Sequence, residues 1–229
     1  MSNRRAKLRA GINIKRILMK SLIGDSKFVK IRQIKEKLEI FTGWETANKY
    51  QVLDEHGGPL GYAAERKKGI LGALTKNFLK SHRPMDIDIW NSQKELVLTA
   101  KRPFFFFFSD MRVYRDQHLL GEIKTRFGII KRKYDLLDAR GSVFARIESP
   151  RWRLWTFQIK DSRGEDAGQI SKKWGGVLKE VFSDSDSFGT DLSKRDWKEE
   201  EQALILLATL SIDLDFFEEN SSSVLGLFD

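Results

Sequence analysis

Hydrophobic and polar positions follow a repeated strand–turn–strand pattern from about Glu39 onward. Each of five short turns opens with Asp or Asn, and three of the five contain Gly, residues that tight turns favour. With flanking segments, the pattern predicts about ten to twelve antiparallel strands, which favours a closed barrel or a sandwich because closure removes unpaired strand edges. The predicted hairpins pair residues 49–53 with 60–65, 86–90 with 95–101, 110–115 with 119–125, 128–137 with 142–148, and 153–160 with 167–172.

One segment near the carboxyl terminus, Glu200–Phe217, has the pattern of a helix. Its stretch Ala203–Ile212 is apolar on every side, so we expect this helix to be buried all round. Asp196 followed by Glu199 predicts a capping box at its start, and Asp213 is expected to meet a donor from a strand or at the barrel rim. The uncharged run, residues 202–212, is eleven residues long, whereas about 20 are needed to cross a bilayer.

These patterns together predict a mainly β protein, a closed antiparallel barrel of about twelve strands around a buried hydrophobic C-terminal helix near residues 197–218. Residues 220–229 are expected to form a tail. Five consecutive phenylalanines, Phe104–Phe108, predict a strand that is covered on both faces or lies against a partner, because a solvated face does not hold every second Phe.

The charge is distributed unevenly, which changes the picture at the amino terminus. The whole chain carries 41 Lys+Arg and 32 Asp+Glu, a formal net charge of +9. Residues 1–37 hold twelve of these bases and two of the acids, and the other residues hold 29 bases and 30 acids. The sequence therefore predicts a polybasic amino-terminal arm, residues 1–37, on a nearly neutral barrel of residues 38–219.

The arm contains the candidate lipid-binding bases. Ile14, Leu18 and Leu22 recur at helical spacing, which is typical of a basic amphipathic segment on an anionic membrane surface. The segment is also similar to an Arg-rich, acid-poor mitochondrial presequence. It would equally attract nucleic-acid phosphates, or it is a solvated tail that only aids solubility. The candidate lipid-binding residues are Arg4, Arg5, Lys7, Arg9, Lys15, Arg16 and Lys20.

The chain contains no Cys, which excludes disulfides, Cys-ligated zinc, iron–sulfur clusters, a Cys nucleophile and palmitoylation. The three His residues share no motif, and the sequence has no phosphate-binding Gly loop, HExxH or nucleophile elbow. We therefore expect no catalytic residues and no enzyme activity.

Four stretches, in order, carry a resemblance to a known family. Phe41–Thr46 with Asn48–Tyr50 reads FTGWET and NKY, and Gly168–Glu180 reads GQISKKWGGVLKE. Asp184–Gly189 reads DSDSFG, and Ile212–Glu218 reads IDLDFFE. These stretches resemble the phospholipid scramblase family, and the resemblance runs from about Glu39 to Glu218. It implies a tubby-like fold, in which about twelve strands close around a hydrophobic C-terminal helix.

The resemblance also implies a function and a location. Members are associated with calcium-stimulated, energy-independent movement of phospholipids between leaflets, at the cytosolic face of a membrane. A cluster of palmitoylated Cys in the family would fall near Arg102–Tyr114, where this chain has Phe104–Phe108. We therefore expect a cytoplasmic protein, peripheral at the inner membrane face, with the arm as its main anchor and Phe104–Phe108 as a second contact.

The acidic segment supplies the candidate calcium ligands, Asp184, Asp186 and Asp191. Gly189 follows Asp184 by five residues, as Gly does in an EF-hand loop. Arg195, however, stands where that loop has its bidentate Glu. The other interpretation is a solvated loop that joins the last strand to the helix.

Three functions follow from this sequence. The leading hypothesis is a scramblase-like protein that moves phospholipids between leaflets, with calcium as a modulator. The alternative is a membrane-tethered module that binds anionic lipid or serves as an adaptor without translocation. The third is a protein that uses the basic arm to bind nucleic acid.

Overall fold

The computed structural model describes residues 22–34, 46–66, 84–105, 108–126, 131–150, 155–172 and 187–225, with the backbone alone for 46, 47, 131, 150 and 215–225. In these residues twelve strands form one closed barrel, in which sequential neighbours pair antiparallel and β12 returns to β1. The strands are β1 (Phe28–Gln33), β2 (Thr46–Leu53), β3 (Pro59–Arg66), β4 (Met85–Asn91), β5 (Leu96–Arg102), β6 (Asp110–Arg115), β7 (His118–Arg126), β8 (Lys131–Asp138), β9 (Val143–Pro150), β10 (Thr156–Asp161), β11 (Asp166–Ser171) and β12 (Ser187–Asp191).

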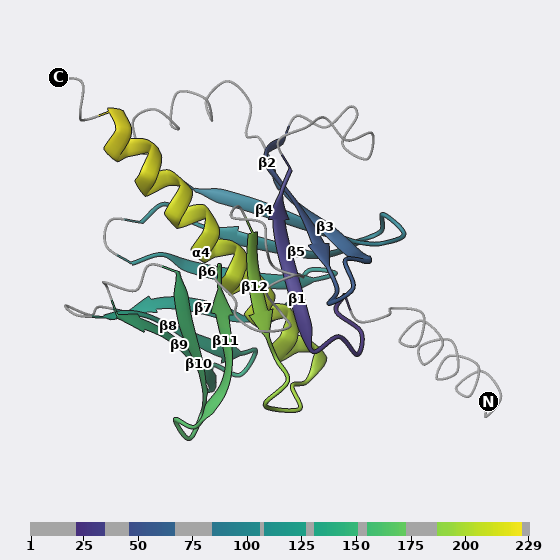
Figure 1. Ribbon diagram of the computed structural model, residues 1–229, viewed down its shortest axis with the longest axis vertical. Coiled ribbons are helices and arrows are strands. Elements are labelled where there is room, and N and C mark those ends of the chain that lie inside the picture. The colour runs from purple at the N-terminus through teal and green to yellow at the C-terminus, as the bar shows by residue number, and fades with distance from the viewer. Residues whose placement is uncertain are drawn as a thin grey trace, which may run out of the picture.

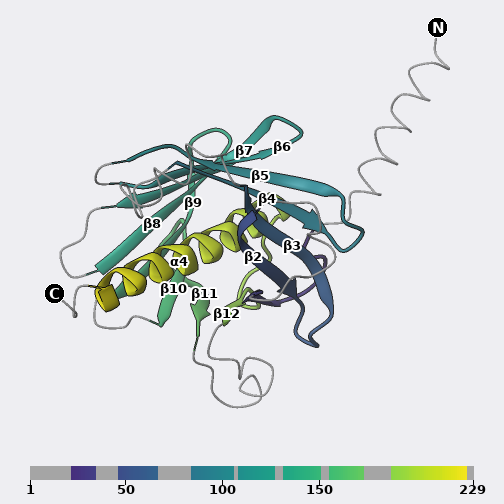
Figure 2. The same ribbon diagram turned by 90° about the horizontal axis from the view of Figure 1, so that it is seen from above.

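One long helix, α4 (Glu199–Leu225), runs through the barrel, as the two views in Figures 1 and 2 show. Every side chain from Ala203 to Leu214 is buried, because the barrel wall covers this apolar stretch on all sides. The helix contacts β7, β8, β12 and β1. The predicted fold, a mainly β closed barrel with a buried C-terminal helix, is confirmed.

The helix comes very close to the wall at Gly121 of β7. A Cβ atom at this position would lie 2.7 Å from Cδ1 of Leu204 and 2.1 Å from the carbonyl oxygen of Leu137. Gly is therefore required for α4 and the neighbouring strand to pack here. A buried polar contact between helix and wall is made by the hydroxyls of Thr190 and Thr209, which lie 3.0 Å apart.

Four of the five predicted turns share one hydrogen-bonding pattern. The side chain of the first residue accepts the amide of the residue four positions later, as Asp138 Oδ1 does from Ser142 at 2.9 Å. The residue just before the one that donates this amide has a positive φ, which is +81° at Gly141 and +66° at Lys94. This explains why the turns open with Asp or Asn and favour Gly. The first residues of the four turns are Asp54, Asn91, Asp138 and Asp161.

The five predicted hairpins supply β2 to β11, and the two remaining strands lie outside them. Residues 28–33, which the sequence interpretation assigned to the arm, form β1, and Leu22 and Ile23 belong to the core. The boundary at residue 37 is therefore wrong. The bases Lys30 and Arg32 alternate with buried Val29 and Ile31. The sequence interpretation counted these bases as part of the arm and therefore did not predict a strand here.

The predicted strand at Phe104–Phe108 is also wrong for the residues of this run that the structure describes, Phe104, Phe105 and Phe108. The described residues of this run lie in the connection between β5 and β6. The side chains of Phe104 and Phe108 are 39% and 47% exposed. The run therefore presents aromatic surface to the outside at these two positions.

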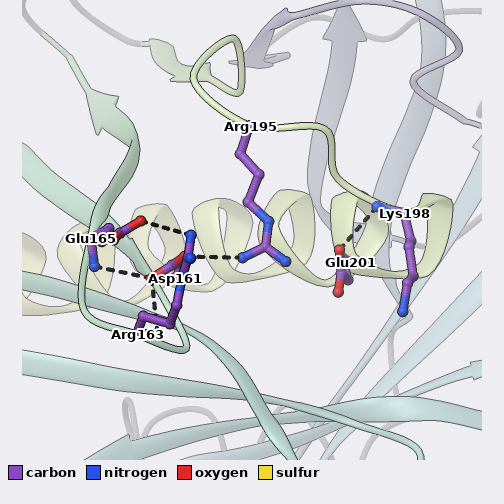
Figure 3. A network of polar contacts seen from close by, with 6 residues as sticks. All are labelled: Asp161, Arg163, Glu165, Arg195, Lys198 and Glu201. Carbon is purple, nitrogen blue, oxygen red and sulfur yellow. Dashed lines mark hydrogen bonds and ion pairs between the residues drawn. The ribbon is translucent and has the colours of Figure 1, made fainter.

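The helix differs from its prediction at both ends. It continues to Leu225, through residues assigned to the tail. At its start the amide of Lys198 donates to Glu201 Oε2 at 2.9 Å, a contact drawn in Figure 3. Asp196 instead forms an exposed ion pair with Lys27. Glu201 thus caps the amide of Lys198, the residue just before the helix, in place of the predicted Asp196–Glu199 capping box.

The barrel has two ends that are built differently. The turn end carries the five hairpin turns and the β12–α4 connection, and there Arg115 pairs with Glu199 at the helix start. The loop end is the opposite rim, where β1, β3, β5, β7, β9 and β11 finish. The carboxyl-terminal part of α4 points toward the loop end (Figure 1), where Asp213 meets Lys172.

Candidate lipid-binding surface

The predicted calcium ligands are only partly described. Asp184 and Asp186 lie outside the described residues. Asp191 ends β12, and its Oδ1 accepts hydrogen bonds from the amide and hydroxyl of Ser193 at 2.8 and 2.7 Å. Gly189 lies within β12 and not in a sharp turn, so the EF-hand-like spacing does not form such a loop there. Calcium binding stays a prediction; within the described ranges, no group of three or more His, Asp or Glu could hold a metal ion.

Arg195, in the position of the missing EF-hand carboxylate, belongs to a structural network at the turn end (Figure 3). Its Nη1 lies 3.5 Å from Asp161 Oδ2, and its guanidinium lies 4.6 Å from the ring centre of Trp197. Desolvation opposes the charge of Asp161, but hydrogen bonds from Glu165 and Arg163 outweigh it and lower the pKa of Asp161. The network ties the β10–β11 turn to the segment that leads into α4.

The seven candidate lipid-binding bases of the arm all precede residue 22, so they lie outside the described residues. Their role in membrane binding stays a prediction.

The interior of the loop end contains a buried ion pair. Lys172 Nζ lies 3.4 Å from Asp213 Oδ1, and the side chains are only 10% and 4% exposed. The same ammonium lies 4.7 Å from the ring centre of Phe188 and 5.5 Å from that of Trp155. Asp213 therefore meets a donor that follows a strand, as expected, and the pair fixes the helix to the rim.

Hydroxyl side chains on three neighbouring strands form hydrogen bonds near this pair. Ser149 donates to the carbonyl oxygen of Thr156 at 2.6 Å, and Ser171 donates to the carbonyl oxygen of Trp155 at 2.9 Å. The Thr156 and Ser171 hydroxyls lie 3.2 Å apart. Backbone carbonyls at the start of β10 thus satisfy the two buried serines at this rim.

The outside of the loop end combines exposed bases with exposed phenylalanines. The side chains of Arg112 and Arg126 are 63% and 47% exposed, and they lie on the strands next to the connection that holds Phe104 and Phe108. Burial raises the pKa of Asp110, the acid between them, although Lys124 and other bases oppose this. This mixture of cationic and aromatic groups suits the interface of an anionic membrane.

A groove of about 520 Å³ lies on the outer face of β5 and β6. Its walls combine apolar side chains such as Leu96 and Val97 with the bases Arg66 and Lys101. Lys101 Nζ stands 5.5 Å from the ring centre of Tyr114. The hydrogen bond to Asp88 is the main reason that the pKa of Arg66 is raised. Apolar walls with cations at the loop-end side suit an amphiphile that carries a phosphate.

Sequence reasoning missed the groove bases and Lys172. Arg66 and Lys101 stand at the ends of alternating strands, a position that carries no local signal for a site. Lys172 could have been found only by asking which base forms an ion pair with Asp213, the acid in an otherwise apolar helix. That question requires the strand order, which brings the end of β11 beside the carboxyl-terminal part of α4.

Comparison with known proteins identifies this architecture. The scramblase family model matches residues 14–219, so the chain belongs to the scramblase family. The chain is 26% identical to a phospholipid scramblase family protein of Schizosaccharomyces pombe over 90% of its own length and 63% of that protein. It is also 26% identical to human phospholipid scramblase 1, covering 85% of this chain and 64% of the relative. The chain thus spans somewhat less than two thirds of these two proteins.

A third relative has a name that refers to mitochondria and not to scramblases. The protein called altered inheritance rate of mitochondria protein 25, from Saccharomyces cerevisiae, is 26% identical over 85% of this chain and 71% of its own length. No solved structure matches the chain. Among the described residues, no helix has the length and apolar character required to span a membrane.

Proposed function

We propose that this protein binds anionic phospholipid membranes from the cytosolic side and moves phospholipids between the two leaflets without an energy source. The observation that carries the proposal is the family match over residues 14–219, which covers the barrel from β1 to β12 and most of α4. The name of the human relative supports the activity. The exposed aromatic and basic groups of the loop end support a membrane as the partner.

Lipid movement requires polar headgroups to cross the hydrocarbon, which is costly unless polar partners accompany them. The hydroxyl groups of Ser149, Thr156 and Ser171 and the neighbouring pair Lys172–Asp213 support the proposal, because they bring hydrogen-bonding groups to the rim. On this proposal the barrel holds these groups next to the bilayer, and no covalent chemistry is involved.

A bleaching assay on vesicles tests lipid movement directly. The full-length protein is reconstituted into vesicles that carry fluorescent phospholipid in both leaflets, and dithionite is added outside. Without movement, only the outer-leaflet half of the fluorescence is lost. The proposal expects loss well beyond half with the protein and not with empty vesicles. Equal loss in both preparations would remove translocation from the proposal.

Calcium is the proposed modulator of this movement. The same assay is run in calcium and in chelator with the double variant Asp184→Ala/Asp186→Ala. Its matched control is Asp25→Ala/Asp196→Ala, which removes two exposed acids at the turn end. We expect calcium to accelerate bleaching in wild type and control but not in the first variant. A calcium response that survives this variant assigns the ion to other ligands.

The groove on β5 and β6 favours a second function, lipid binding without translocation. A cavity of about 520 Å³ with bases at one side could hold a lipid headgroup as an adaptor would. The two functions separate in one experiment. Protein that floats with anionic vesicles but leaves bleaching at half of the fluorescence is a binding module and not a scramblase.

The arm is proposed as an electrostatic anchor. Replacing its seven candidate bases by Gln leaves the chain length and β1 intact, whereas removing residues 1–37 would delete a barrel strand. Each base near an anionic surface contributes about 1 kcal/mol, so we expect flotation on anionic vesicles to fall at least about ten-fold. Stronger retention of nucleic acid than of vesicles would favour the nucleic-acid alternative, and a mitochondrial location of a fluorescent fusion would support targeting.

A further inference from the structure

Three large hydrophobic side chains are exposed in the described part of the chain, and two of them lie at the loop end. Phe104 and Phe108 lie in the β5–β6 connection, and their side chains are 39% and 47% exposed. The third, Leu96, begins β5 at the turn end and is 53% exposed. Two exposed phenylalanines on one short connection form a local apolar surface, whereas a single exposed leucine is ordinary.

The charges are also divided between the ends. Taken over the connections and the three residues at each strand end, the described turn end holds ten bases and fourteen acids, with the first three helix residues included. By the same measure the described loop end holds eleven bases and four acids. The loop-end bases are Arg32, Arg66, Lys101, Arg102, Arg112, Lys124, Arg126, Lys131, Arg132, Lys133 and Lys172, and the acids are Glu65, Asp86, Asp110 and Glu148.

The rest of the sequence changes this division at one end only. The connections that join the loop-end strands, together with the chain from Asp213 onward, contain eleven further bases and eleven further acids, so the loop end keeps an excess of seven positive charges. Residues 1–21 precede β1, which begins at the turn end, and they add seven bases and no acids, so that side totals seventeen bases and fourteen acids. Within the barrel itself, without residues 1–21, the positive charge is concentrated at the loop end, where it would be attracted to an anionic surface.

We propose that the loop end is the membrane-facing surface, in which Phe104 and Phe108 insert at the headgroup boundary of an anionic bilayer while the surrounding bases contact lipid phosphates. The inference rests on the proposed function and assigns its surface. Charge complementarity selects an anionic bilayer as the occupant, because the basic excess surrounds the aromatic pair. Among the described residues, only the loop end combines a basic excess with a pair of exposed aromatic side chains, and this combination assigns the membrane contact to that end of the barrel.

Flotation of full-length variants with vesicles of phosphatidylcholine and about 30 mol% phosphatidylserine tests this surface. The variant Phe104→Ser/Phe108→Ser removes the aromatic pair. Leu119→Ser is its matched control, a half-buried apolar residue of β7 at the turn end that does not line the groove. We expect the double variant to lose at least about ten-fold in vesicle partitioning and the control to stay within about two-fold of wild type.

A second pair of variants tests the charges. Lys101→Gln/Arg112→Gln removes two exposed loop-end bases, and Lys94→Gln/Arg140→Gln removes two exposed bases at the turn end. The loop-end pair should reduce partitioning about ten-fold or more at low salt, and the turn-end pair should leave it unchanged or slightly higher. Equal melting temperatures establish that each variant is folded.

The outcomes distinguish the inference from the function on which it rests. Wild-type protein that floats, together with a folded Phe104→Ser/Phe108→Ser variant that floats equally well, overturns the loop-end surface and leaves membrane binding intact. Wild-type protein that never floats overturns both. A double variant that loses self-association in the ultracentrifuge, but not partitioning, makes the aromatic pair a contact between two copies of the chain and overturns the inference.

Discussion

The turn end and the loop end of the barrel are built from the same strands, yet they satisfy their polar groups by different means. At the turn end, short connections fold back on themselves, and side chains such as Asp138 bind the amides of their own turn. Exposed ion pairs such as Arg163–Glu165 add to this local network. These contacts stabilise the hairpins and leave few polar groups of the turns available to bind a partner.

The loop end also pairs bases with acids of the strands, as Arg66 does with Asp88 and Arg126 with Asp135, but its described bases outnumber its acids. Its connections are longer, and it exposes Phe104 and Phe108. Its buried ion pair, Lys172–Asp213, ties the rim to the helix. The difference indicates that one end maintains the fold and the other faces a partner, a division common where loops on a rigid scaffold carry function.

The largest expected effect tests what holds the loop end together. Asp213→Leu leaves Lys172 as a buried charge without this partner, so we expect the free energy of unfolding to fall by about 3–5 kcal/mol. The double variant Lys172→Met/Asp213→Leu should recover most of this loss, because two apolar side chains require no desolvation of charge. Urea unfolding measures both. A loss in the double variant as large as in the single one would show that the ion pair does not set the stability here.

A smaller effect is expected at the turn end. Asp138→Ala removes the acceptor of the Arg140 and Ser142 amides, which should lower the free energy of unfolding by about 1–2 kcal/mol. Asp138→Asn keeps an oxygen in place and should lose less than half of that. Urea midpoints of the two variants check the order. If Ala and Asn behave alike, the side-chain hydrogen bonds do not stabilise this turn.

Lys94 offers a gain of stability at the same end. It is the residue at positive φ in its turn, +66°, where the three equivalent turns have Gly. A left-handed conformation costs an L-residue about 1–2 kcal/mol, and Gly escapes most of that at some entropic cost. Lys94→Gly should therefore stabilise the protein by about 0.5–1 kcal/mol, visible as a higher melting temperature. Gly141→Ala, the reverse change in an equivalent turn, should destabilise it.

The smallest expected effects have opposite signs at the two ends. The hydrogen bond from Lys194 lowers the pKa of Asp166 at the turn end, so its stabilisation is present above the ordinary Asp pKa near about 3.9 and is lost as pH falls through the lower folded-state pKa. Burial raises the pKa of Asp110 at the loop end, so protonation relieves a penalty as pH falls through that raised value.

The pH dependence of urea unfolding in two Asn variants checks these signs. At neutral pH, Asp166→Asn should lower the free energy of unfolding by a few tenths of a kcal/mol, about the contribution of an exposed ion pair. Asp110→Asn should raise it or leave it unchanged, and its curve should converge with that of wild type in acid. A destabilised Asp110→Asn would show that nearby bases outweigh burial at this carboxyl.

Local pattern was sufficient for most of the fold. Alternating strands and Asp- or Asn-led turns gave β2 to β11, because both signals reside within a few residues of each other. The uniformly apolar stretch Ala203–Ile212 correctly predicted a buried helix. The strand β1 was missed because Lys30 and Arg32 read as part of a basic arm, and only pairing with β2 and β12, distant in sequence, makes them a strand.

The candidate surface was less accessible to sequence reasoning. Phe104–Phe108 was marked as a membrane contact, but its hydrophobic run alone suggested a covered strand, and its exposure depends on its position after the end of β5. The concentration of bases at the loop end could not be predicted, because the sequence alone does not show which strand ends meet at the same end of the barrel. The ion pair of Lys172 with Asp213 joins residues far apart in sequence and required the closed barrel.

Labels at the two ends of the barrel test most directly which end faces the membrane. Because the chain has no Cys, Phe108→Cys at the loop end and Ala139→Cys in the exposed β8–β9 turn each create one site for an environment-sensitive fluorophore on the full-length protein. On addition of vesicles with phosphatidylserine, the account predicts a blue-shifted, brighter emission from the label at position 108 and unchanged emission from the label at position 139. The opposite result, a response at position 139 and none at position 108, would contradict it.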